Sequence, residues 1–176
     1  MLGHSRDDWQ QIAQRLADAR LTTLAIDLPG AVPPGDSETL AGWSGDVRAA
    51  INFLASRAET KPGAIGVLGA SLGASLGTIA AAADPQVRSL LLVSPVTDYR
   101  GLRIEAALRE FGARPAYLIA SRQDSFSARS SRDLAKNPSG PREVRISDVA
   151  GNGTALLTRD PDLVTAVIEW FQRTLG

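Results

Sequence analysis

Two serines in one glycine-rich stretch are the residues of this sequence best suited to do chemistry. The stretch GVLGASLGASLG contains the pattern Gly-x-Ser-x-Gly twice, around Ser71 and around Ser75. A serine acts as a nucleophile when it stands on a strained strand-to-helix turn, where flanking glycines avoid collisions of a Cβ with nearby backbone. Ser71 directly follows the apolar run AIGVLG and fits that turn, whereas Ser75 falls one helical turn later. The alternative is a glycine-rich turn used for close packing or phosphate binding.

The elements that must position Ser71 alternate between helices and short apolar strands. A helix over 5–20 has Ser5 as its N-cap and Asp8 at the capping-box position. Hydrophobic periodicity predicts further helices over 37–59, 72–82, 101–111, 128–136 and 161–175, and strands over 21–27, 64–69, 87–93, 116–120 and 143–146. This order predicts an α/β fold, with a mainly parallel sheet of about five strands and helices on both faces. No long polar linker interrupts it, so we expect a single domain over 1–176.

Composition argues against several other kinds of site. The chain has no cysteine and His4 is its one histidine, so we expect no metal and no cofactor. A formal net charge of +0 argues against nucleic acid and anionic membranes as partners. No apolar run reaches the roughly 18–20 residues that span a bilayer, and the start lacks a signal peptide, which favours a cytoplasmic location. Homo-oligomerisation stays open.

The chain resembles the α/β-hydrolase superfamily, especially its small dienelactone-hydrolase-like and esterase-like members. The opening GHSRDDWQQIAQRLADARLTTLAIDLPG is similar to the family's oxyanion loop, first helix, next strand and D-x-x-G turn, and the resemblance continues to the last helix. It implies acyl transfer from a small ester-like substrate to water, with Ser71 as the nucleophile.

The resemblance also implies partners for Ser71. The segment ARPAYLIASRQDSFSARSSRDLA is similar to the family's acid-bearing strand and loop, which puts the acid on Asp124, while Asp98 is a lower-ranked candidate. Taken alone, Asp124 also fits a helix cap. In the loop VAGNGTALL, Asn152 stands where family members typically carry the base, a histidine. An amide cannot take and return a proton at neutral pH, so the resemblance predicts impaired catalysis. The alternative is that Asn152 belongs to a favoured Asn-Gly turn.

The N-terminal region bears on the oxyanion hole. The resemblance assigns one donor to the amide of Leu72 and the other to the first residues, at Leu2. His4, in the same loop, is a less favoured replacement for the missing base. In the family a further strand precedes this loop and lies between the strands expected at 21–27 and 64–69. The sequence begins at Met1 without it, so we expect direct pairing of those two strands or an open slot of unpaired backbone groups.

Three hypotheses therefore remain. The first is a serine esterase-type hydrolase that acts through Ser71 and is impaired by Asn152. The second is a non-catalytic homologue whose pocket binds a small ligand or serves as an interaction surface. The third is a fragment of a longer hydrolase. The glycine-flanked Ser71 favours the first hypothesis, and Asn152 favours the other two.

Overall fold

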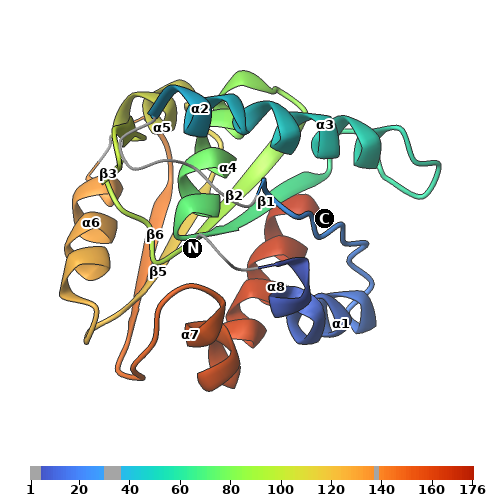
Figure 1. The fold of residues 1–176 in the computed structure, drawn as a ribbon. Coiled ribbons are helices and arrows are strands. Elements are labelled where there is room, and N and C mark those ends of the chain that lie inside the picture. Colours follow the sequence, from blue (N-terminus) through green and yellow to red (C-terminus); the bar gives the residue numbers. More distant parts are fainter. Residues whose placement is uncertain (1–4, 30–36, 137–138) are drawn as a thin grey trace.

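Four parallel strands form the sheet that carries the candidate site. The computed structural model describes residues 5–29, 37–136 and 139–176. The strands are β1 (Ile65–Ala70), β2 (Val87–Val93), β5 (Ala116–Ser121) and β6 (Arg142–Ser147), and they lie in the order β1-β2-β5-β6 (Figure 1). All three neighbouring pairs are parallel. The α/β class with a parallel sheet is confirmed, with one strand fewer than predicted in the described part of the chain.

Helices cover both faces of this sheet (Figure 1). One face packs against α3 (Ser44–Ala55), α4 (Leu72–Ala83), α5 (Glu105–Glu110) and α6 (Ser125–Ala135). The other face packs against α1 (Gln10–Asp18), α7 (Thr154–Arg159) and α8 (Pro161–Leu175). A 3₁₀ turn, η1 (Arg6–Trp9), precedes α1, and α2 (Ser37–Gly42) packs against the start of α4. No helix in the described part of the chain has the length and apolar character needed to cross a membrane.

The two central strands are buried on both faces, which explains their uninterrupted apolar runs. In β2, Leu90 and Leu92 enter the core on one side of the sheet, and Leu91 and Val93 enter the core on the other. All four side chains are 0% exposed. Strands of a parallel sheet covered by helices on both sides require this composition. The core therefore fixes the sheet to which the loops of the site are attached.

Residues 21–27, predicted as a strand, lie outside the sheet, and that prediction is wrong. A strand requires a hydrogen-bonded neighbour, and the described residues offer this segment none. Across a cavity of about 640 Å³ it faces β1, whose only partner in the described sheet is β2. Of the two expected alternatives, direct pairing of the two segments does not occur, and the described residues show the other, a gap with unpaired backbone groups beside β1.

Local contacts shift several predicted helix boundaries. The predicted helix over 37–59 is divided into α2 and α3, and α3 ends at Ala55, where Ser56 Oγ donates to Phe53 O at 2.7 Å. Ser5 caps the first helical segment as predicted, and its Oγ accepts from Asp7 N at 3.2 Å. That segment begins as η1 before it becomes α1. The short helix α7 was not predicted.

A small hairpin shortens the helix predicted over 101–111. It consists of β3 (Asp98–Tyr99) and β4 (Leu102–Arg103), which pair antiparallel. Arg100 and Gly101 form its turn with positive φ angles of 50° and 90°. The hairpin occupies the residues before α5, so this helix begins only at Glu105.

Candidate active site

Ser71 stands on a strained turn between β1 and α4. Its φ of 52° and ψ of −117° lie in a region that residues other than glycine rarely adopt. Backbone hydrogen bonds hold this conformation: Ser71 N donates to Val93 O of β2 at 3.0 Å, and Ser71 O accepts from Ala74 N at 3.0 Å. Such strain places the side chain at the carboxyl end of the strand, where a nucleophile is needed.

One glycine beside Ser71 is required by the closeness of the backbone. A Cβ on Gly69 would lie 2.3 Å from Gly73 O, whereas a Cβ on Gly73 would meet nothing within 4 Å among the described residues. Only the first glycine of the pattern is therefore sterically required at this turn. Ser75, the second serine, lies inside α4 and is 0% exposed. The geometry of a nucleophile turn is found at Ser71 and not at Ser75.

Asp124 ends the loop after β5 and caps α6. Its Oδ1 accepts from Ser127 N at 3.1 Å, and its Oδ2 accepts from Ser127 Oγ at 2.7 Å. Oδ2 also accepts from Asn152 Nδ2 at 2.6 Å. Partial burial raises the pKa of Asp124, but the hydrogen bonds from Ser127 and Asn152 outweigh it, so this pKa lies below its usual value. Asp124 thus serves as a helix cap and also contacts the residue expected at the base position.

Asn152 belongs to the loop 148–153, the Asn152 loop, which joins β6 to α7. Gly153 takes a φ of 58°, and its N–H donates to Ser94 Oγ, at the end of β2, at 3.0 Å. A Cβ on Gly153 would lie 3.7 Å from that of Ala70, the residue before Ser71. The loop therefore packs against the end of β1 on one side while Asn152 binds Asp124 on the other.

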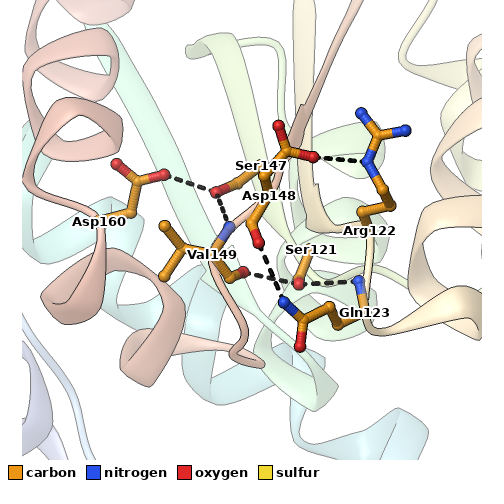
Figure 2. A network of polar contacts seen from close by, with 7 residues as sticks. All are labelled: Ser121, Arg122, Gln123, Ser147, Asp148, Val149 and Asp160. Atoms are coloured by element: carbon orange, nitrogen blue, oxygen red, sulfur yellow. Dashed lines mark hydrogen bonds and ion pairs between the residues drawn. The ribbon is translucent and has the colours of Figure 1, made fainter.

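A polar network holds the Asn152 loop against the loop after β5, residues 122–124 (Figure 2). Ser121 Oγ donates to Val149 O at 2.7 Å, and Gln123 Nε2 donates to Asp148 O at 3.1 Å. Arg122 forms an ion pair with Asp148. Because both loops follow neighbouring parallel strands, these contacts fix Asp124 and Asn152 relative to each other.

The remaining predicted site residues divide into three cases. Leu72 begins α4, and as a first-turn residue its N–H has no acceptor within the helix, so it is available to a ligand. Leu2 and His4 lie outside the described residues. Asp98 accepts from Gly101 N at 2.6 Å and from Arg103 Nε at 3.1 Å, so it stabilises the β3–β4 hairpin.

Ser94 is the contact residue that sequence reasoning missed. It has a φ of 50° and is 1% exposed, and its hydroxyl holds the Asn152 loop. A serine after an apolar strand is the only local signal, and it does not reveal the partner.

Within the described ranges, no group of three His, Cys, Asp or Glu side chains is placed to hold a metal ion.

Solved structures share this fold at low sequence identity. A dienelactone hydrolase from Anabaena variabilis is 20% identical, with a TM-score of 0.81 over 99% of this chain and 83% of that chain. An esterase from Pyrococcus furiosus is 16% identical, with a TM-score of 0.75 over 98% of this chain and 78% of that chain. The esterase domain of a Rhodothermus marinus protein is 18% identical, with a TM-score of 0.75 over 99% of this chain and 83% of that chain. No curated protein matches the sequence significantly. The profile of the Alpha/beta hydrolase family matches residues 2–174, and the chain therefore belongs to this family.

Proposed function

We propose that this protein is a serine esterase-type hydrolase of small carboxylic esters, in which Asn152 slows turnover. Ser71 is the nucleophile and Asp124 the acid partner. The observation that carries the proposal is the placement of a strained Ser71 at the end of β1, beside a loop whose Asn152 binds Asp124 at 2.6 Å. Family membership and the esterase-like fold support the same chemistry.

The proposed reaction begins with attack of Ser71 Oγ on the ester carbonyl carbon. The carbonyl oxygen becomes an oxyanion, which the N–H of Leu72 can stabilise. The alkoxide leaves, and water then hydrolyses the acyl-enzyme. In each step a proton leaves the attacking hydroxyl and another reaches the departing oxygen, and solvent water carries these protons where no side chain acts as the base.

Asn152 cannot carry that proton. Its Nδ2 is committed to Asp124, which leaves Oδ1 as a hydrogen-bond acceptor toward a hydroxyl or a water. An amide oxygen accepts a hydrogen bond without becoming a base at neutral pH. The rate then rests on the oxyanion donors and on substrate binding, which alone give roughly 10³–10⁴-fold over water in serine hydrolases.

A non-catalytic homologue that binds an ester-like ligand is the second candidate. The Asp124–Asn152 hydrogen bond favours this candidate. The bond gives the Asp124 carboxylate a hydrogen-bond donor that does not titrate near neutral pH. In this alternative Ser71 and Leu72 would bind a ligand carbonyl without forming an ester bond.

Hydrolysis of p-nitrophenyl acetate by the purified protein tests the proposal. We expect a low rate that Ser71→Ala abolishes and that Ser75→Ala leaves unchanged, with circular dichroism to show that both variants are folded. Ser75 is the matched control because it occupies the same position in the second Gly-x-Ser-x-Gly pattern. Equal rates for the wild-type protein and Ser71→Ala would contradict the esterase proposal.

A further inference from the structure

Asn152 and Gly153 form the only asparagine–glycine pair of the sequence. Asparagine is a chemically labile residue, and before a glycine it is exposed to attack by the next backbone nitrogen, because no Cβ obstructs the approach. The other two asparagines are poorly suited to this reaction. Asn52 precedes the bulky Phe53 inside α3, and the remaining one precedes a proline, which has no N–H. The chemistry of deamidation therefore selects Asn152.

The reaction would convert the Asn152 amide into a carboxylate and release ammonia. The Gly153 nitrogen gives its proton to solvent base and forms a bond to Asn152 Cγ. The bond between Cγ and Nδ2 breaks, and ammonia leaves with a proton from water. Water then opens the resulting cyclic imide at one of its two carbonyl carbons, which gives aspartate or isoaspartate. Water is the only co-reactant, so the step needs no further group.

In the folded protein, hydrogen bonds hold both groups that have to react. Gly153 N–H donates to Ser94 Oγ at 3.0 Å, and both residues are buried, so this proton is shielded from solvent base. Asn152 Nδ2 donates to Asp124 Oδ2 at 2.6 Å, which restrains the amide that the Gly153 nitrogen would attack. The Asn152 loop is therefore in a closed, unreactive conformation.

The backbone at Gly153 explains why a labile pair stands in this loop. Its φ of 58° lies in the left-handed region that favours glycine. A Cβ at this position would lie 3.7 Å from Ala70 Cβ, which is an ordinary contact. The conformation, rather than the space, thus favours glycine here. A larger residue would slow the attack on Asn152 but would strain the turn, so resistance to deamidation has to come from the contacts of the loop.

We propose that Asn152 is a deamidation site whose rate is set by opening of the Asn152 loop, with Ser94 as the residue that holds the loop closed. The reaction proceeds only from the open loop, in which Gly153 N–H has left Ser94 Oγ. The polar contacts of the loop with residues 121–123 also hold it closed. The proposal does not depend on whether Ser71 is a nucleophile, because it concerns a chemical change of Asn152 itself.

Deamidation would alter the candidate site directly. A carboxylate at position 152 puts a second negative charge beside Asp124, where Asn152 supplies a hydrogen-bond donor. Asn152→Asp reproduces one of the two products. We expect hydrogen exchange of the Gly153 amide, measured by NMR, to be at least about tenfold faster in this variant, because repulsion favours the open loop. A folded variant with wild-type exchange would contradict this consequence.

Peptide mapping by mass spectrometry follows the conversion of Asn152 in the full chain at neutral pH. A synthetic peptide of residues 148–156, DVAGNGTAL, gives the rate in the absence of the fold. We expect Asn152 in the folded protein to convert at least about tenfold more slowly than in the peptide, because the reaction waits for loop opening.

Removal of the Ser94 hydroxyl tests its part in closing the loop. Ser94→Ala should speed both Asn152 conversion and Gly153 amide exchange by about three- to tenfold, the effect expected from one hydrogen bond. Ser75→Ala is the matched control, because Ser75 Oγ is buried and has no hydrogen-bond partner among the described residues. Ser94→Gly loses the same hydroxyl but relieves the φ of 50°, so Asn152 should convert faster with little loss of Tm.

Three results would overturn the proposal. The first is conversion of Asn152 as fast in the folded protein as in the peptide. The second is unchanged conversion in the folded Ser94 variants, or an equal rise in Ser75→Ala, which would indicate general destabilisation. The third is no conversion in the Ser94 variants after the peptide has converted fully. If neither Ser94 variant folds, Asp124→Ala decides: it frees the Asn152 amide, and an unchanged conversion rate would overturn the proposal.

Discussion

Asn152→His would put a proton carrier where the chain has an amide. In both side chains a nitrogen lies two bonds from Cβ, so imidazole Nδ1 can take the place of Asn152 Nδ2, 2.6 Å from Asp124 Oδ2. Nδ1–H then donates to the carboxylate, which leaves Nε2 as the acceptor. Because Gly153 packs beside Ala70, we expect Nε2 to lie within hydrogen-bond reach of Ser71 Oγ.

The expected gain follows from what a positioned base contributes. General bases are worth about 10²–10⁴-fold in rate. We expect kcat/KM for p-nitrophenyl acetate to rise at least about a hundredfold, or about 2.7 kcal/mol of transition-state stabilisation. The rate of the variant should increase with pH through the imidazole pKa, about 6.5 when unperturbed, because only the neutral ring accepts a proton. The wild-type protein should show no such imidazole-dependent rise.

Two double variants control for this gain. Ser71→Ala combined with Asn152→His should remove the gain entirely, and Asp124→Asn combined with Asn152→His should reduce it, since the carboxylate orients the ring. Circular dichroism establishes that each variant is folded. A folded Asn152→His protein with unchanged activity, or a gain that survives Ser71→Ala, would refute the reasoning.

Three further predictions concern the support of the site and the core. Gly69→Ala should lower Tm by several degrees, because its Cβ would lie 2.3 Å from Gly73 O, and a wild-type Tm would contradict the close approach. Asp124→Ala removes a helix cap and should cost about 1–2 kcal/mol in urea unfolding at pH 7. The folded-state pKa of Asp124 is lowered, so its contribution is present above the unfolded pKa of about 3.9 and lost as the pH falls through the folded value. An equal cost at pH 7 and pH 3 would contradict this assignment. Arg114→Ala should cost about 2–4 kcal/mol, because its guanidinium donates to five carbonyl oxygens at the ends of core elements. Arg114→Lys should restore only part of the lost stability, because an ammonium group cannot reproduce the planar set of guanidinium donors, and full restoration would contradict this explanation.

The strand-to-helix turn at Ser71 and the buried strands were predictable because their signals are local. An apolar run followed by glycine, serine and a helix of small residues specifies the turn within one short stretch. The uninterrupted apolar sequence of β2 likewise predicts that this strand is buried on both faces of the sheet. The family resemblance pointed to Asp124 and Asn152, which the structure joins by a hydrogen bond.

The features that escaped prediction depend on partners distant in sequence. Residues 21–27 have strand-like composition, but pairing decides whether a strand forms, and composition does not reveal a missing neighbour. Ser94 holds Gly153 across 59 positions of the chain. The hairpin at Asp98 rests on a turn with two positive φ angles, and the arginine at one of them gives no local signal for it.

The most direct test of the central claim, that Ser71 is the nucleophile, is the position of a fluorophosphonate adduct located by mass spectrometry. A fluorophosphonate phosphonylates a serine that can attack: an Oγ–P bond forms, the P–F bond breaks and fluoride leaves, and the resulting phosphonate ester hydrolyses slowly enough to be located. We predict a slowly formed adduct on Ser71 in the wild-type protein, faster formation in Asn152→His, and none at this position in Ser71→Ala. Ser75 should stay unmodified because it is 0% exposed inside α4. An adduct on Ser75, or equal labelling of the wild-type protein and Ser71→Ala, would contradict the account.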